Sequence, residues 1–148
     1  MNVKSPLIAL LALIVMSCNP TKKTNPESNG ETITEKYWKL KTLQGKDIKM
    51  KESQEREIYF ILRTNDNRVT GFAGCNALSG EFILEEVNRI RFKNMAVTMK
   101  VCPDLSINDS EFLAVFNLAD NYTVKDDILS LNVGKRAPLA VFEAVYMN

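Results

Sequence analysis

The sequence predicts an α+β domain in which a curved, mostly antiparallel sheet of about eight strands forms an incomplete barrel, with one main helix packed on it. Three observations support this fold class. After Tyr37 the chain consists mostly of short strand-like runs. Short turns separate these runs, which favours antiparallel pairing of consecutive strands. One segment breaks the pattern with helical spacing, and so few helices beside so many strands favour a strongly curved sheet.

The first half of the domain supplies the strands. Tyr37–Leu43 is the first strand-like run. Glu57–Arg63 is apolar on both faces, which is typical of a buried strand. The turn-forming Thr64–Asn67 follows, so we expect a hairpin over Ile58–Ala73. In Arg89–Met95, apolar and charged residues alternate, which predicts a strand with one wet face.

The second half contains the helix and a closing hairpin. Residues 106–121 place four apolar side chains at helical spacing, namely Phe112, Val115, Phe116 and Ala119. Asn108 can cap this helix, with Glu111 at the capping-box position three residues on. Ile128–Val133 and Leu139–Tyr146 then form the last two strands, joined by a five-residue loop. The helix is therefore inserted between the fifth and sixth strands.

The N-terminal residues are typical of a bacterial lipoprotein. Lys4 precedes the apolar run Leu7–Met16, which is too short to span a bilayer and has the length of a signal-peptide core. Ser17 and Cys18 follow it and resemble a lipobox, whose cysteine is lipidated. We expect a signal peptide over residues 1–17, a flexible tether over 18–36 and the folded domain over 37–148. The alternative is an ordinary secretory signal that ends beside an incidental cysteine.

The charge balance argues against nucleic acid as a partner. Residues 1–17 contain one of the 19 basic side chains and none of the 18 acidic ones. The mature chain would therefore carry equal numbers of each. No block of like charge stands out, so charge-steered binding to nucleic acid or anionic lipid has no support.

The remaining cysteines, Cys75 and Cys102, form an even pair in an exported domain. Such surroundings favour a disulfide. A reduced or redox-switching pair is an alternative. So is a copper(I) site, because Met95 and Met99 lie near Cys102 and soft sulfur suits that ion. A catalytic thiolate usually needs a histidine, and the chain has none.

The glycines around Cys75 predict a bend in the chain. Gly71, Gly74 and Gly80 flank this cysteine, and glycine within strands marks bulges or close backbone approach. A phosphate-binding loop would need a helix to follow. The next run is strand-like, so we prefer the bend, which would let the segment with Cys102 lie close by.

These motifs resemble those of the META/HslJ-like domain family. The resemblance extends from Tyr37 to Tyr146 and is most specific in two elements. The first is Gly74-Cys75-Asn76, with Gly71 just before it, and the second consists of Thr98, Met99, Cys102 and Pro103.

The resemblance implies a curved antiparallel sheet with a packed helix, in exported or lipid-anchored bacterial proteins linked with heat stress and antibiotic tolerance. The family has no established reaction, so no catalytic residue is carried over and we expect neither a metal nor a cofactor. Three polar positions, Asn76, Thr98 and Glu111, lie inside or beside the motifs. They favour turn formation and capping over contact with a ligand or partner.

We therefore expect a non-enzymatic, lipid-anchored envelope protein on the outer membrane facing the periplasm. Its partners would be the membrane, through the lipid, and an unknown envelope protein or hydrophobic ligand, with Phe112 and Phe116 lining a cavity if the barrel is incompletely filled. Soft-metal handling is the alternative. An enzyme is disfavoured, because the acid pairs Glu85-Glu86 and Asp126-Asp127 are adjacent residues at a strand end and in a turn.

Overall fold

The computed structural model describes residues 32–102 and 107–146. The predicted signal peptide, Cys18, most of the predicted tether and Pro103 lie outside these ranges. The described elements are, in chain order, β1 (Tyr37–Leu43), β2 (Lys46–Asp47), β3 (Tyr59–Arg63), β4 (Arg68–Phe72), β5 (Ala77–Glu85), β6 (Arg89–Val97), α1 (Asp109–Leu118), β7 (Asn121–Lys125), β8 (Ile128–Asn132) and β9 (Ala140–Val145).

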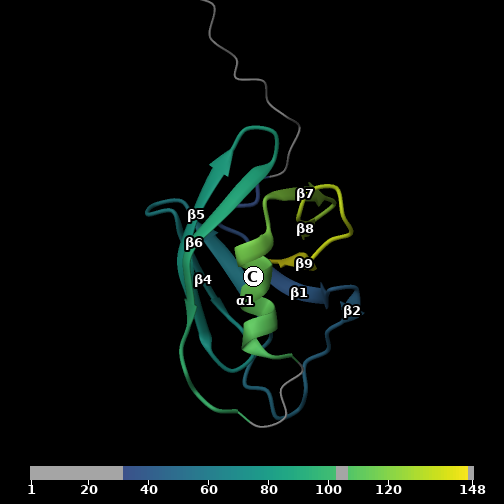
Figure 1. Cartoon of the computed structure of the whole chain (residues 1–148). Coiled ribbons are helices and arrows are strands. Elements are labelled where there is room, and N and C mark those ends of the chain that lie inside the picture. Colours follow the sequence, from purple (N-terminus) through teal and green to yellow (C-terminus); the bar gives the residue numbers. More distant parts are fainter. Residues whose placement is uncertain (1–31, 103–106, 147–148) are drawn as a thin grey trace, which may run out of the picture.

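The strands form one closed antiparallel sheet (Figure 1). Neighbours follow the order β1, β3, β4, β5, β6, β7, β8 and β9, and β9 pairs back onto β1 through six residue pairs. The short β2 and β3 pair with the same edge of β1, β3 near its start and β2 at its end. A register shift between Leu40 and Thr42 marks a bulge in β1, and bulges bend strands in this way.

The expected incomplete barrel of the α+β class, with a main helix, is therefore wrong. The described part of the chain is an eight-stranded closed barrel with one extra strand and a single ten-residue helix, so it is mostly sheet. The ring closes where the first strand meets the last, about a hundred residues later in the chain. Local periodicity reveals strands but not pairing at such a separation. The individual hairpin β3–β4 and the closing hairpin β8–β9 do form where expected.

The barrel has one thin seam, between β6 and β7. A single residue pair, Arg89 with Asn121, joins these strands. The helix α1 packs along β6 beside this seam (Figure 1). The ring of Phe92 on β6 meets that of Phe116 on α1 edge to face, with centroids 5.0 Å apart. Covering a strand edge with a helix is a common way to protect it.

Aromatic side chains fill the interior. Phe60 of β3 packs edge to face against Phe116 of α1 and Phe142 of β9, with centroids 5.4 and 4.8 Å apart. Phe112 packs on Phe116 in the same way. All four rings are fully buried, and each burial contributes roughly 1.5–3 kcal/mol. The helical apolar face expected from the sequence is thus the face that enters the core, where it packs against other rings.

The folded part begins earlier than Tyr37, the boundary expected from the sequence. Ile33 is buried in the core, and its carbonyl accepts a hydrogen bond from the indole Nε1 of Trp38 at 2.7 Å.

No helix within the described ranges has the length and apolar character that a bilayer span requires.

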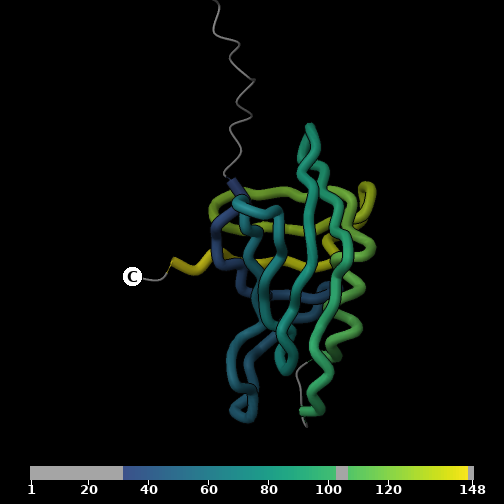
Figure 2. The backbone as a smooth tube through the Cα atoms, turned by 90° about the vertical axis from the view of Figure 1, so that its left-hand side faces the viewer, coloured from purple at the N-terminus to yellow at the C-terminus, as the bar shows by residue number. Residues whose placement is uncertain are grey.

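The two ends of the barrel hold different features, as Figures 1 and 2 both show. At one end, here called the tether end, lie the first described residues and the turn between β5 and β6. At the other, here called the cysteine end, lie the loop between β2 and β3 and the start of α1. Cys75 and Cys102 lie beside that loop. The family motifs meet at the cysteine end.

Candidate functional site

The first motif begins where β4 leaves the sheet. Gly71 lies so close to β3 that a Cβ there would collide with the carbonyl oxygen of Tyr59 and the Cα of Phe60. Gly74 has a φ of +102°, a conformation that side chains other than glycine rarely adopt. These two glycines let the chain pass tightly over β3 and turn, which delivers Cys75 and Asn76 to the cysteine end.

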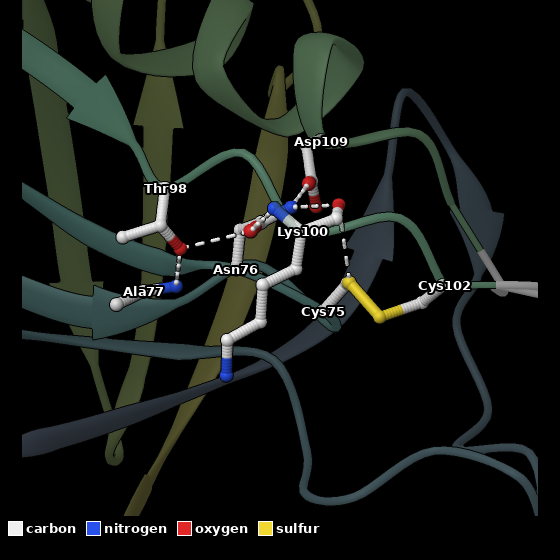
Figure 3. Close-up of a disulfide and its surroundings, with 7 residues drawn as sticks. All are labelled: Cys75, Asn76, Ala77, Thr98, Lys100, Cys102 and Asp109. Atoms are coloured by element: carbon white, nitrogen blue, oxygen red, sulfur yellow. Dashed lines mark hydrogen bonds between the residues drawn. A yellow bond between two sulfur atoms is a disulfide. The ribbon is translucent and has the colours of Figure 1, made fainter.

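Asn76 is the centre of the site (Figure 3). Only 3% of it is exposed, and its side chain makes four hydrogen bonds. Its Oδ1 accepts from the Lys100 amide at 2.7 Å and from the Thr98 hydroxyl at 2.8 Å. Its Nδ2 donates to the Lys100 carbonyl at 3.1 Å and to Asp109 Oδ2 at 2.5 Å. One side chain thus holds both backbone groups of Lys100 and the start of α1.

Thr98 completes this arrangement from the end of β6. Its hydroxyl donates to Asn76 and accepts from the Ala77 amide at 3.1 Å. Its own amide donates to the Ala77 carbonyl, also at 3.1 Å. The hydroxyl therefore orients the Asn76 amide group and extends the pairing of β5 with β6 by one residue.

The two expected disulfide residues are bonded to one another. A disulfide joins Cys75 and Cys102, whose Cα atoms are 6.0 Å apart. Cys75 Sγ also lies 3.6 Å from the Lys100 carbonyl oxygen (Figure 3). The segment from Thr98 to Cys102, here called the clamped loop, is therefore fixed by Asn76 in its middle and by a covalent bond at its end.

The start of α1 is attached to the same centre. Asn108 caps the helix through Oδ1, which accepts from the Ser110 amide at 2.8 Å, as the sequence predicts. Asp109 accepts from Asn76, and among the described residues its buried Oδ1 has no hydrogen-bond partner. Neither sequence motif marks Asp109 as part of the site. Its position beside the predicted cap, in the first helical turn, was the one available signal.

The other predicted residues lie outside this hydrogen-bond network. Glu111 is exposed in the first turn of α1, and its amide donates to the Asn108 carbonyl. Met99 lies in the clamped loop with its side chain 96% exposed. Asn76, Thr98 and both cysteines are thus brought together, whereas Glu111 and Met99 point elsewhere.

The sulfur atoms considered for copper(I) do not converge. Met95 is half-buried and packs against the core beside Gly80, while Met99 is exposed. The cysteine sulfurs are bonded to each other. Across the described ranges, no group of three or more His, Cys, Asp or Glu side chains could hold a metal ion.

A groove runs beside the clamped loop. It has a volume of about 260 Å³ and separates this loop from the loop between β2 and β3. Phe72, Gly74 and the two cysteines line it together with Ser53, Gln54, Glu55, Lys100 and Val101. The groove gives a solvent-facing boundary to a site whose polar centre is buried.

The tether end carries a smaller polar cluster. The Lys36 ammonium lies 3.1 Å from Asp127 Oδ1, and the Tyr146 hydroxyl donates to the same oxygen at 2.5 Å. This Lys36–Asp127–Tyr146 cluster ties the first described residues to the turn after β7 and to the last residues. Hydrogen bonds from the Tyr146 hydroxyl and from the Lys36 ammonium hold the pKa of Asp127 below its ordinary value, and the bond from Tyr146 has the larger effect.

Comparisons with known proteins agree on the fold. No curated protein matches the chain. An NMR structure of a protein from Burkholderia xenovorans is 18% identical, with a TM-score of 0.63, over 78% of this chain and 85% of that one. A second NMR structure of a protein is also 18% identical, with a TM-score of 0.59, over 75% of this chain and 90% of its own. At this identity the likeness shows the fold alone.

The family model of the META domain matches residues 31–146. This range begins just before the buried Ile33 and ends with the residues that follow β9. It includes both cysteine motifs and confirms the resemblance found in the sequence. The chain belongs to the META domain family.

Proposed function

We propose that this META-domain protein is a non-enzymatic interaction module of the bacterial cell envelope, lipid-anchored through Cys18 to the outer membrane, facing the periplasm and serving in stress tolerance. One observation carries the proposal. The polar groups of the motifs, above all the Asn76 amide, are used to fix the backbone of Lys100. Groups used in this way determine the shape of a surface and are not free to act on a substrate.

The position of the tether supports the same proposal. The described chain enters at Thr32, at the end of the barrel opposite to the clamped loop (Figure 2). An anchor that precedes Thr32 would leave the clamped loop on the side away from the membrane. A surface held away from its own membrane is accessible to other proteins of the envelope.

Metabolic labelling tests the anchor. Cells that express the full chain are grown with an alkyne fatty acid, and incorporation into the protein is measured. We expect labelling of the wild type, loss of the label in Cys18→Ser and retention in Cys102→Ser, which keeps the lipobox intact. An unlabelled wild-type protein would refute the anchor.

Photo-crosslinking in cells tests the interaction role. A photoreactive amino acid replaces Glu111, near the clamped loop, or Lys135, in the loop between β8 and β9. We expect a discrete crosslinked protein band from position 111, stronger under heat stress, and none from position 135. Equal or absent crosslinking at both positions would count against an interaction module at the cysteine end.

A further inference from the structure

Met99, in the clamped loop, is the most exposed methionine of the described residues. It is 96% exposed, whereas Met50 is 51% exposed and Met95 is half-buried. Methionine is among the residues most often found buried in folded proteins. Its thioether sulfur is also a target of oxidants, and it reacts without losing a proton, so no neighbouring base is required. A sulfur atom in such an open position is therefore a candidate for chemical modification.

The backbone on both sides of Met99 is fixed. The Thr98 amide donates to the Ala77 carbonyl, and the Thr98 hydroxyl donates to Asn76. The same asparagine holds the amide and the carbonyl of Lys100. None of these bonds uses the Met99 side chain. A chemical change at its sulfur atom would therefore leave the conformation of the clamped loop intact.

The two described cysteines are less reactive towards oxidants than a free thiol would be. Cys75 and Cys102 are bonded to each other, so neither presents a thiolate. The nearest described sulfur atoms that an oxidant can convert without opening this bond belong to methionines. Met99 lies in the same loop as Cys102 and has its side chain in solvent.

Met95 on β6 provides the contrasting case. Its side chain packs against the core, and its Sδ lies so close to Gly80 on β5 that a Cβ on this glycine would collide with it. Oxidation of Met95 would force a polar oxygen atom against the neighbouring strand. Methionine sulfoxide disrupts packed surfaces in this way, so the two methionines of one strand and its following loop differ in what their oxidation would do.

We propose that Met99 is a site of reversible oxidation in the folded protein, with a peroxide or hypochlorous acid as the oxidant. The sulfur atom donates an electron pair to one oxygen of hydrogen peroxide, the O–O bond breaks, and the products are the sulfoxide and water. A reductase that uses two thiols restores the thioether, as the thiols form a disulfide and the oxygen leaves as water. The inference goes beyond the proposed interaction function and does not depend on it.

The consequence of this reaction is confined to the surface. Oxidation turns an apolar side chain into a polar one at the most exposed point of the cysteine end, while the disulfide and the bonds of Asn76 remain. Because the sulfoxide would lie in solvent, a reductase can reach it without unfolding the domain.

Peptide mapping of the full chain after treatment with hydrogen peroxide tests the proposal. Trypsin cleaves after Lys93 and Lys100, so Met95 and Met99 lie in one peptide, and fragment ions show which of them has gained oxygen. We expect Met99 to be oxidised at least about fivefold faster than Met95 in the native protein, because full access to Met95 requires local opening of the sheet. In concentrated urea the two rates should become equal.

Two matched variants identify the reactive sulfur atom. Met99→Leu removes it and keeps an apolar side chain, so we expect the fast uptake of oxygen at this peptide to disappear. Met95→Leu should retain the fast uptake. Protein oxidised at Met99 should have the same melting temperature as the untreated protein. The two methionine sulfoxide reductases, one for each sulfoxide epimer, should remove the oxygen from the folded protein when dithiothreitol is supplied.

Three results would overturn the proposal. They are equal oxidation rates of Met95 and Met99 in the native protein, a fall in melting temperature on oxidation of Met99 alone, and a Met99 sulfoxide that the reductases remove only after unfolding. Labelling of Cys18 and crosslinking from position 111 do not involve this sulfur atom, so the proposed function and the oxidation site can fail separately.

Discussion

The cysteine end and the tether end of the barrel are held together by different kinds of interaction. At the cysteine end, a disulfide and a buried asparagine fix the clamped loop and the start of α1. At the tether end, the Lys36–Asp127–Tyr146 cluster joins the chain's entry to its exit through partly exposed charged groups. Water and salt reach the second set and not the centre of the first.

This contrast shows where the molecule needs a fixed shape. Exposed ion pairs contribute little to stability and are screened by salt. A buried amide whose partners are also withdrawn from water is costly to remove, because each partner is left unsatisfied. The clamped loop therefore keeps one conformation, whereas the tether end only needs to hold its strands in place.

Asn76→Ala should have the largest effect. It would leave the amide and carbonyl of Lys100 without their partners and separate α1 from β5, so we expect a loss of about 3–5 kcal/mol in the free energy of unfolding. Urea denaturation measures it. Asn132→Ala is the matched control, since Asn132 is also buried but its side chain makes longer bonds, at 3.2 and 3.5 Å. A similar loss in both variants would mean that the four bonds of Asn76 contribute no more than those of another buried asparagine.

Opening the disulfide should have the next largest effect. The bond closes a loop across a separation of 27 residues, which corresponds to about 3–4 kcal/mol on the chain-entropy model. We expect the double variant Cys75→Ser, Cys102→Ser, and the wild type in dithiothreitol, to lose comparable stability in urea denaturation. Dithiothreitol should not affect the double variant. If it did, the loss would not come from this bond.

Gly71→Ala tests the tight passage of β4 over β3. The added methyl group would collide with backbone atoms of Tyr59 and Phe60, which cannot move aside as a flexible side chain can. We expect a loss of about 2–3 kcal/mol, measured by urea denaturation. Gly134→Ala is the control. Gly134 has a φ of +57° and open space around it, so it should lose only about 1 kcal/mol.

Asp127→Asn should have the smallest effect, and a pH-dependent one. The pKa of Asp127 is held below its ordinary value by the Tyr146 hydroxyl and by Lys36. A lowered carboxyl pKa stabilises the fold above about pH 4 and stops doing so as the pH falls through the folded-state value. The difference in unfolding free energy between wild type and variant should therefore shrink between neutral and strongly acidic pH, and also in high salt.

Asp126→Asn provides the control at the tether end. Asp126 occupies the same turn. Its Oδ2 lies 3.9 Å from Lys125 Nζ, and both side chains are exposed. We expect no pH-dependent difference from the wild type in the same denaturation series. A pH dependence equal to that of Asp127→Asn would mean that general charge effects outweigh the cluster.

The sequence revealed features that depend on neighbouring residues. The helical spacing of Phe112 and Phe116 predicts the face that enters the core, and the sequence also predicts Asn108 as the cap. The pairing of Cys75 with Cys102 follows from the count of cysteines in a chain that we expect to be exported. Each of these inferences needs only local spacing or composition.

Features that depend on distant partners stayed hidden. Closure of the barrel requires β1 to pair with β9, and no local pattern in either strand identifies the other as its partner. The buried position of Ile33 depends on Trp38 and on the strands around it. The sequence predicts turn formation for Asn76. Its bonds to Lys100 and Asp109 exist only once three segments have come together, so no local pattern reveals them.

The thin seam between β6 and β7 gives the Asn76–Asp109 bond a second role. One residue pair joins those strands, and α1 packs along β6 beside this seam. The first residue of α1 is attached through Asn76 to the segment that leads into β5. Any event that moves α1 away from β6 would remove the support beside this weakly paired seam and would favour separation of β6 from β7. Asn76, which fixes the clamped loop, therefore also helps to keep the barrel closed by holding the start of α1.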